Sequence, residues 1–473
     1  METDSFNLLN ILPILSVTIV SLVVLTVESL VKKNEASSFW ISVWGLVFSG
    51  VITMVTIPWR GVAMSGMITV GGYGSFFAML FIIAALFTII LSRDYLQKTY
   101  KRIGEFYLLI LFATIGMMLM AAAADLVVLF LGLELMSICL YVLAGFLRLQ
   151  SKSNEAALKY FLLGAFATGF LLYGIALVYG ASGTTDISFI VANAGTLMSQ
   201  KIFIAGLGLI LIGFAFKVAA VPFHMWVPDV YEGSPTIVSG FMSTGAKAAA
   251  FSAFLLMFAH QVFGDGNFMV ALSVLAAASM IIGNLVALSQ TNIKRMLAYS
   301  SIAHAGYMLT GLAAANSLGK MGIIFYLTAY TFMNLGAFGI ISILESREGK
   351  NLQFEDYAGL GTKKPVLAAL MAIFMFSLSG IPPFAGFLGK YYVFAAAVNA
   401  DLTWLAILGV VTSAIGVYYY LRIVVMMYFK EGTLDSPESV SGLSLALLSI
   451  AALLLFELGI FPSTLLAMIE RVM

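Results

Sequence analysis

Residues 216–251 read FKVAAVPFHMWVPDVYEGSPTIVSGFMSTGAKAAAF and contain the most informative pattern of the chain. Two apolar runs, each carrying a lysine, are separated by three prolines, Pro222, Pro228 and Pro235. Proline removes a backbone donor and clashes with the preceding turn, so the first helix is expected to break. Irregular backbone at membrane depth is tolerated only where it faces protein or a water-filled cavity. The pattern therefore predicts an interrupted membrane helix.

The composition of the whole chain supports a membrane location. Its 473 residues are 61% hydrophobic and 10% charged, and the mean hydropathy is +1.03. Soluble domains are about 45–50% apolar and about 25% charged, so too little polar surface remains here to cover a soluble particle. The first residues, METDSFN, are acidic where a secretory signal would be positive, which predicts that the first apolar run is a retained helix.

Apolar runs of about 20 residues, the length that spans a bilayer, occur fourteen times. They lie at 8–30, 38–57, 75–92, 105–123, 125–148, 158–180, 202–221, 236–260, 268–289, 297–315, 321–345, 366–399, 402–429 and 440–466. The run 366–399 contains Gly380, Pro382 and Pro383, which predict a second broken helix. A β-barrel is not expected, because barrel strands alternate over about 10 residues. The predicted fold class is an all-α polytopic membrane protein of about 14 transmembrane helices.

The basic residues predict the topology. Seventeen of the 24 Lys and Arg residues fall in one set of alternate loops, four in the other set, and three inside spans. The positive-inside rule places the richer set in the cytoplasm. Both termini are then expected on the outer side of the membrane.

Several functions are excluded by what the chain lacks. The single cysteine, Cys139, excludes a disulfide framework, a thiolate zinc site and an iron–sulfur cluster held by this chain alone. The net charge of +1 offers no basic face, so no nucleic acid is expected as a partner. GLGLILIG at 206–213 lies in an apolar run, and GLGTKK at 359–364 has the wrong order for a P-loop. Neither hydride transfer nor ATP hydrolysis is expected, and no cofactor is assigned to this chain.

Four ionisable groups lie deep inside predicted spans: Lys217, Lys247, Lys390 and Glu134. A charged lysine at a helix centre costs roughly 2.5–3.5 kcal/mol on insertion scales. Such residues either hold helices together or carry function. Because four of them occur in one chain, the functional interpretation is favoured over a purely structural one.

The chemistry of these groups points to proton transfer. Glu134, Ser137 and Tyr141 fall at i, i+3 and i+7 of one helix and form a narrow polar stripe. Burial disfavours the charged form of a lysine and a nearby carboxylate restores it, so moving the acid switches the lysine between holding and releasing a proton. Sodium is a poorer candidate, since lysine cannot coordinate a cation.

The three histidines differ in their surroundings. His304 lies between Ser300 at i−4 and Tyr307 at i+3, a second polar stripe that supports a relay role. His224 follows the first helix break and is a weaker candidate, whereas His260 lies at a helix end. Scattered histidines without carboxylates or thiolates at ligand spacing do not predict a metal site.

Three stretches of sequence resemble one known family. Residues 222–251, QTNIKRMLAYSSIAHAGY at 290–307 and SGIPPFAGFLGKYYVF at 379–394 are similar to the subunit N family of proton-pumping NADH:quinone oxidoreductase, respiratory complex I. The resemblance covers nearly the whole chain, and fourteen spans with outward termini also match that family.

The resemblance implies a role for each buried charge. Glu134 matches the family's fifth-helix glutamate, Lys217 the lysine of the broken seventh helix and Lys247 the connecting lysine of the eighth. His304 matches the tenth-helix histidine and Lys390 the terminal lysine of the broken twelfth helix. Helices four to eight and nine to thirteen would form inverted five-helix repeats, with proton half-channels to the two sides.

The resemblance also implies a domain organisation and a cellular setting. Residues 1–104 would form three N-terminal helices, 105–265 and 266–430 the two repeats, and 431–473 a C-terminal helix. NADH, FMN, iron–sulfur clusters and quinone are expected in partner subunits, within a hetero-oligomer that contains other membrane-arm subunits in a bacterial inner membrane. Two alternatives remain: a subunit of a multi-subunit cation/proton antiporter, and an assembly spacer whose charges only hold helices together.

Overall fold

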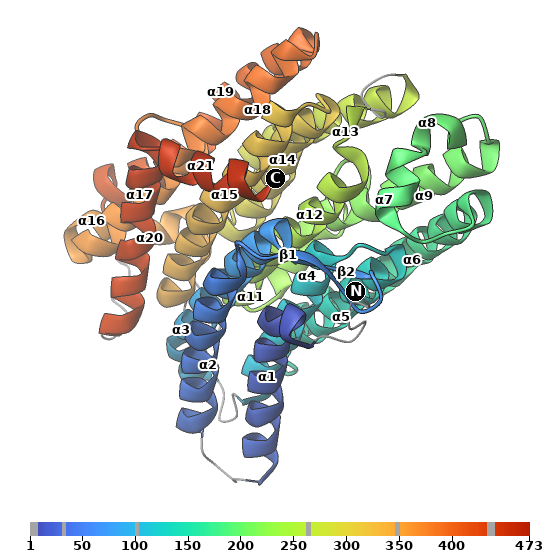
Figure 1. Ribbon diagram of the computed structural model, residues 1–473. Helices are drawn as coiled ribbons and strands as arrows, with labels where there is room; N and C mark the ends of the chain where they lie inside the picture. Colours follow the sequence, from blue (N-terminus) through green and yellow to red (C-terminus); the bar gives the residue numbers. More distant parts are fainter. Residues whose placement is uncertain (1–7, 31–34, 100–103, 262–265, 346–350, 433–439) are drawn as a thin grey trace.

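The protein is a bundle of long helices, and the computed structural model describes residues 8–30, 35–99, 104–261, 266–345, 351–432 and 440–473 (Figure 1). Twelve helices in these ranges are long and apolar enough to cross a membrane. A thirteenth, α14, has 21 residues, or about 30 Å, but its polar side chains lower its hydropathy. The predicted run 366–399 is interrupted between α17 and α18. These elements account for the fourteen predicted spans.

The N-terminal part contains three long helices and a small hairpin. Its elements are η1 Leu8–Ile11, α1 Leu12–Leu30, α2 Glu35–Thr56, β1 Arg60–Ala63, β2 Ile68–Gly71 and α3 Gly72–Thr99. The two strands pair antiparallel, with Arg60 opposite Gly71. The sequence analysis did not predict this hairpin, because each strand has only four residues.

The next part contains the first broken helix. Its elements are α4 Gly104–Ala122, α5 Leu126–Ala144, α6 Ser151–Ser182, α7 Ile187–Ala192, α8 Ala194–Leu197, α9 Lys201–Val218, α10 Val227–Gly233, α11 Thr236–Phe241, the π-helix η2 Met242–Ala246 and α12 Lys247–Phe258. The predicted break lies between α9 and α10. Asp125 caps α5 by accepting a hydrogen bond from the Val127 amide at 2.7 Å.

The C-terminal half contains the second broken helix. Its elements are α13 Asn267–Leu288, α14 Ile293–Ala313, α15 Ser317–Leu344, η4 Phe354–Tyr357, α16 Leu360–Lys363, α17 Pro365–Ser379, α18 Ala385–Asn399, α19 Thr403–Phe429, α20 Gly442–Ile460 and α21 Ser463–Val472. The break between α17 and α18 contains Gly380, whose positive φ of 82° ends α17.

The centre of the bundle is the helix α15. The 18 most apolar consecutive residues of α15 are all buried. In the continuous α11–η2–α12 helix, 94% of the corresponding residues are buried. Helices α1 and α20 lie at the periphery, and only a third of their most apolar residues are buried. Figure 1 shows α16 and α17 on the opposite side of the view from α6 and α9. Nearly all side chains of α12 and α14, and most of those of α15, are buried.

Close helix contacts in the bundle depend on glycine. Gly116 of α4 packs against α5 so closely that an added Cβ would lie 2.5 Å from the Met136 nitrogen and 2.6 Å from the Gly132 oxygen. Small residues at membrane helix interfaces allow backbones to approach in this way. The position of α5, and with it the Glu134–Tyr141 stripe, depends on this contact.

We predict that Gly116→Ala lowers the thermal unfolding midpoint of the protein in detergent, because α4 and α5 must separate. The matched control is Gly169→Ala on α6, where an added Cβ meets nothing within 4 Å. Alanine is a better helix former than glycine by up to about 1 kcal/mol, so the control should hold or raise the midpoint. Equal effects of the two substitutions would contradict the packing argument.

Candidate functional site: a row of buried lysines

Lys217 lies in the last turn of α9 and is only 7% exposed. Its Nζ donates a hydrogen bond to Ser137 Oγ at 2.7 Å and a longer one to the Tyr141 hydroxyl at 3.4 Å. Both acceptors belong to the polar stripe of α5. The structure therefore brings the predicted stripe and the predicted lysine together.

Aromatic rings surround the same ammonium group. Lys217 Nζ lies 5.5 Å from the ring centroid of Tyr141, 6.0 Å from that of Tyr160 and 5.8 Å from that of Phe216. The ring faces stabilise a cation electrostatically, more so where water is excluded. Trp226, in the connection after α9, stacks on Tyr160 and donates from Nε1 to the Phe216 carbonyl at 3.1 Å. The connection after α9 thus supplies a ring that packs against Tyr160, one of the rings beside Lys217.

Glu134 makes no hydrogen bond to Lys217 among the described residues. It lies on the stripe one turn before Ser137 and interacts electrostatically with Lys217. Within the described ranges no ion pair joins the two side chains, and the buried Glu134 Oε1 has no hydrogen-bond partner. The Lys217 ammonium is held by neutral groups in this conformation, with the carboxylate nearby.

His224 lies in the connection between α9 and α10. Its Nδ1 is buried and has no hydrogen-bond partner among the described residues. In the part of the chain that the structure describes, no hydrogen bond joins His224 to Lys217. His260 lies beyond the end of α12, where its Nε2 is 3.1 Å from the Leu256 carbonyl oxygen.

Lys247 follows the π-helix η2 directly and is 2% exposed. Its Nζ donates to both the carbonyl oxygen and the Oγ of Ser301, each at 2.5 Å, and lies 5.8 Å from the Tyr330 ring centroid. Short π-helical insertions in α-helices occur frequently at functional sites, because they turn the following side chains to a new direction. Here the insertion precedes the lysine that contacts α14.

His304 connects three helices. Its Nδ1 lies 2.7 Å from the Tyr326 hydroxyl on α15, and its Nε2 lies 2.9 Å from the Tyr420 hydroxyl on α19. The Tyr420 hydroxyl is also hydrogen-bonded to Ser300 Oγ. The predicted Ser300–His304 stripe is therefore part of a continuous hydrogen-bonded group, and Tyr420 is the link that joins its two members.

Lys390 lies against the end of the broken helix α17. Its Nζ donates to the carbonyl oxygens of Leu378 at 3.1 Å and Ser379 at 2.9 Å, and to Ser413 Oγ at 2.8 Å. These carbonyls are unpaired at a helix C-terminus, where a cation is also favoured by the helix dipole. The Tyr307 ring centroid is 5.2 Å away. The predicted break and the predicted lysine thus form one site.

Tyr307 continues the row toward α13. Its hydroxyl accepts a hydrogen bond from Asn284 Nδ2 at 2.9 Å, and Asn284 Oδ1 accepts one from Tyr419 at 3.0 Å. From Lys247 to Lys390 the site is therefore a row of polar groups along α14. Lys217 and Glu134 form a second group at α5 and α9, and α9 packs against α12, which carries Lys247.

The sequence analysis missed several members of this row. They are neutral residues: Asn284, Ser301, Tyr326, Ser413, Tyr419 and Tyr420. Tyr326, Tyr330 and Asn334 recur every four residues along α15, a signal that could have indicated a polar face in an apolar helix. Within the described ranges, no group of three His, Cys, Asp or Glu side chains could hold a metal ion.

An ion network lies beside this site, around α10. Arg295 Nη1 is 2.8 Å from Asp229 and 2.9 Å from Glu232, while Lys159 pairs with Asp229 and Lys152 with Glu232, each at 2.8 Å. These five residues, the α10 network, connect α6, α10 and α14. They hold the second piece of the broken helix against both halves of the chain.

The positive charges of the network lower the pKa values of its two acids. Partial burial would raise the pKa of Asp229, but hydrogen bonds from Lys159 and Arg295 outweigh it and hold this pKa below its ordinary value. The pKa of Glu232 is lowered in the same way, with burial opposed by Lys152 and Arg295. Both carboxylates are therefore ionised in the folded protein at neutral pH.

Comparisons with known proteins show the family to which the chain belongs. The transmembrane family described as "NADH:quinone oxidoreductase/Mrp antiporter, TM" matches residues 123–416. NADH-quinone oxidoreductase subunit N of Trichlorobacter lovleyi is 47% identical over 99% of this chain and 97% of that protein. The corresponding subunit of Salinibacter ruber is 48% identical over 79% of this chain and 80% of that protein.

Solved structures show the same architecture. A chain of respiratory complex I from Thermus thermophilus with bound aureothin is 35% identical, with a TM-score of 0.83 over 96% of this chain and 98% of that one. A chain of the Mrp complex from Dietzia sp. DQ12-45-1b has a TM-score of 0.87 over 99% of this chain and 97% of that one, at 21% identity, which shows the fold alone.

The fold and the site define a polytopic helical membrane protein with two broken helices and a shielded row of lysines. The chain belongs to the family of NADH:quinone oxidoreductase and Mrp antiporter membrane subunits. The family resemblance found in the sequence is thereby confirmed.

We predict a pH dependence from the α10 network. Because the pKa values of Asp229 and Glu232 are lowered by folding, their contribution to stability is fully present above the unfolded values, about 4. It is lost as the pH falls through the lower folded values. Thermal midpoints of the detergent-solubilised protein between about pH 7 and pH 3 should fall less steeply in the Asp229→Asn, Glu232→Gln double variant than in the wild type. Parallel curves would contradict this prediction.

Proposed function

We propose that this chain is a membrane-arm subunit of NADH:quinone oxidoreductase that carries protons across the membrane, driven by quinone reduction in other subunits. The observation that carries the proposal is the shielded row Lys247–Ser301–His304–Lys390, in which each ionisable group contacts a hydroxyl or a carbonyl. The 47% identity over nearly the full length to a subunit N supports the assignment to this complex.

The proposed relay begins at Glu134 and Lys217. With the carboxylate close, Lys217 holds a proton, and when Glu134 moves away the proton passes to Lys247. From there it crosses the hydroxyls of α14 to His304 and reaches Lys390. Ser300 and Tyr307 assist as accessory groups, and His224 is a candidate at the start of the row.

The energy needed to move a proton outward is comparable with the free energy of a pKa change in a buried lysine. Moving one charge outward against the membrane potential costs about 2.3 kcal/mol per 100 mV. A change of one pKa unit corresponds to about 1.4 kcal/mol. A change of a few pKa units, produced when one buried carboxylate moves relative to one buried lysine, is therefore sufficient to move one proton outward.

The cellular setting follows from the same assignment. The chain would lie in a bacterial inner membrane with both termini on the periplasmic side, as the distribution of basic residues indicates. It would hold no redox centre itself, and NADH, FMN, iron–sulfur clusters and quinone would bind to other subunits. Neighbouring membrane-arm subunits would contact its apolar outer faces.

A cation/proton antiporter subunit is the second candidate, because a Mrp complex contains a chain with the same fold. The two candidates differ in their partners. Co-purification of flavin and iron–sulfur proteins supports the oxidoreductase, whereas small hydrophobic partners alone support the antiporter. An assembly spacer would instead lose assembly and activity in parallel when its buried charges are removed.

The test of the relay is Lys247→Met in the assembled complex, with proton pumping and quinone reduction measured in the same vesicles. Removing a proton-transfer group slows its step by about 10²–10⁴-fold, so proton pumping through this chain should be lost. The control is Lys201→Met, at the exposed start of α9, which should pump like the wild type. Wild-type pumping by both Lys247→Met and Glu134→Gln would overturn the relay.

A further inference from the structure

Arg93 lies near the end of α3 that the basic residues place in the cytoplasm. It follows Gly72, the first residue of α3, by about 32 Å along the helix, and the hydrocarbon core of a bilayer is about 30 Å thick. The sequence that begins at Arg93, RDYLQKTYKR, contains four basic residues and one acid. Arg93 is therefore at the level of the phospholipid headgroups of the cytoplasmic leaflet, at a helix end that attracts anions.

The Arg93 guanidinium is half-buried and packs on aromatic rings. Its Cζ lies 4.7 Å from the ring centroid of Phe39 and 5.9 Å from that of Trp40, both on α2. Among the described residues, this guanidinium forms no ion pair and no hydrogen bond. A guanidinium carries five N–H donors in a planar fork, which matches a phosphate bidentately. The rings thus hold a cation whose hydrogen-bonding capacity is unused within the described part of the chain.

Two acids that lie at the same end of the N-terminal helices bind other partners. Asp94, the next residue on α3, accepts a hydrogen bond from Ser444 Oγ of α20 at 2.8 Å. Glu28 of α1 accepts one from Ser38 Oγ of α2 at 2.8 Å. Neither carboxylate forms an ion pair with Arg93. The positive charge of Arg93 is therefore not neutralised by either of these acids.

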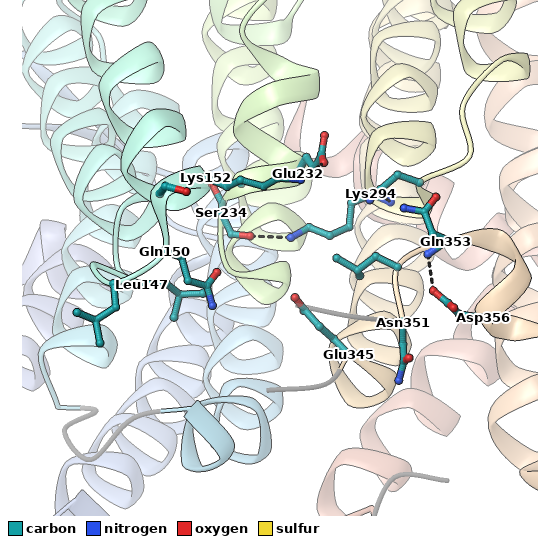
Figure 2. Close-up of a pocket in the computed structure, with 15 residues that line it drawn as sticks. Leu147, Gln150, Lys152, Glu232, Ser234, Lys294, Glu345, Asn351, Gln353 and Asp356 are labelled. Carbon is teal, nitrogen blue, oxygen red and sulfur yellow. Dashed lines mark hydrogen bonds and ion pairs between the residues drawn. The ribbon is translucent and has the colours of Figure 1, made fainter. Parts of the chain in front are cut away.

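Other cations at the cytoplasmic ends of the helices have acceptors within the chain. Lys294 Nζ donates to a backbone carbonyl oxygen at 2.7 Å in the polar cavity that Figure 2 shows. Arg422 of α19 is the closest match to Arg93, because its Cζ lies 4.5 Å from the Phe354 ring centroid. Its Nη2, however, is 3.9 Å from a Glu355 carboxylate oxygen. Arg93 has the ring without the acid, which fits an anion that comes from outside the chain.

An exposed apolar face of α2 continues from Arg93 toward the middle of the membrane. Trp40, Trp44 and Phe48 recur every four residues and are 42%, 64% and 63% exposed, and Val51 follows at 58%. Helix α2 packs mainly against α1, α3 and α4, and Figure 1 shows α1 and α2 at the lower edge of the bundle. From Trp40 to Val51 the helix rises about 16 Å, which is about half the thickness of the hydrocarbon core. The face therefore has the length of one acyl chain in one leaflet.

We propose that Arg93 and the exposed face of α2 bind one anionic phospholipid of the cytoplasmic leaflet. The guanidinium holds the phosphate, and an acyl chain lies along Trp40, Trp44 and Phe48. A zwitterionic lipid is a poorer ligand, because its headgroup brings a cation of its own to a site that is already positive. The bound lipid contacts α2 and α3 at their cytoplasmic ends and holds these two helices together.

The first experiment measures lipid affinity by native mass spectrometry of the full chain in detergent, titrated with phosphatidylglycerol or phosphatidylcholine. The wild type should bind one phosphatidylglycerol more tightly than phosphatidylcholine. Arg93→Gln should weaken phosphatidylglycerol binding about tenfold and remove the preference, and Arg93→Lys, which keeps the charge without the fork, should lie between. The control is Arg422→Gln, which should bind like the wild type, and thermal midpoints without added lipid show that each variant is folded. Equal wild-type affinity for the two lipids, or unchanged binding by folded Arg93→Gln, overturns the proposal.

The second experiment identifies what covers α2 in native membranes. Trp44 is replaced by the photoreactive p-benzoylphenylalanine, and the cross-linked products are identified by mass spectrometry. The expected product is an adduct with an anionic phospholipid, and its yield should fall when Arg93→Gln is added. The control position is Trp404 of α19, which is 51% exposed and where the adduct yield should not depend on Arg93. Cross-linking of position 44 to another protein, or a lipid adduct unaffected by Arg93→Gln, would contradict the proposed site.

Discussion

The rest of the structure depends on one electrostatic constraint: three lysine ammonium groups lie in the interior of a membrane protein. An ammonium-sized ion loses several kcal/mol of solvation there unless protein groups replace water. Lys217, Lys247 and Lys390 are each at most 7% exposed, and no acid within the described ranges forms an ion pair with any of them. Neutral dipoles and ring faces therefore replace the solvent at all three positions.

Each of the three lysines lies next to an interruption of a helix. Lys390 uses the free carbonyls at the end of α17, Lys217 lies where α9 stops and the aromatic connection begins, and Lys247 follows the π-helix η2. A carbonyl within an uninterrupted α-helix is already paired along the helix, but its second lone pair can still accept, as the Ser301 carbonyl of α14 does from Lys247. Free carbonyls at a helix break therefore hold Lys390, whereas hydroxyls of the regular helices α5 and α14 help to hold Lys217 and Lys247.

The sequence was sufficient to predict the parts of this arrangement that are chemically unusual. Lysines and prolines are rare in apolar runs, so Lys217, Lys390 and both helix breaks could be predicted from the sequence alone. The partners of these lysines could not be predicted in the same way, since Ser301 and Tyr420 are ordinary residues whose role depends on which helices meet. The π-helix at 242–246, which packs against α15, has no proline or charge to indicate it.

Charge pairing differs between the edge of the bundle and its interior, and this difference bears on function. In the α10 network each carboxylate contacts two cations, which fixes the ionisation of all five residues and the position of α10. Between Lys247 and Lys390 the partners are hydroxyls, carbonyls and one imidazole. A hydroxyl can donate or accept, so it remains a hydrogen-bond partner whether its neighbour holds a proton or has released it. The interior is thus suited to moving a charge. The ion pairs at its edge are suited to holding the helices in place during that movement.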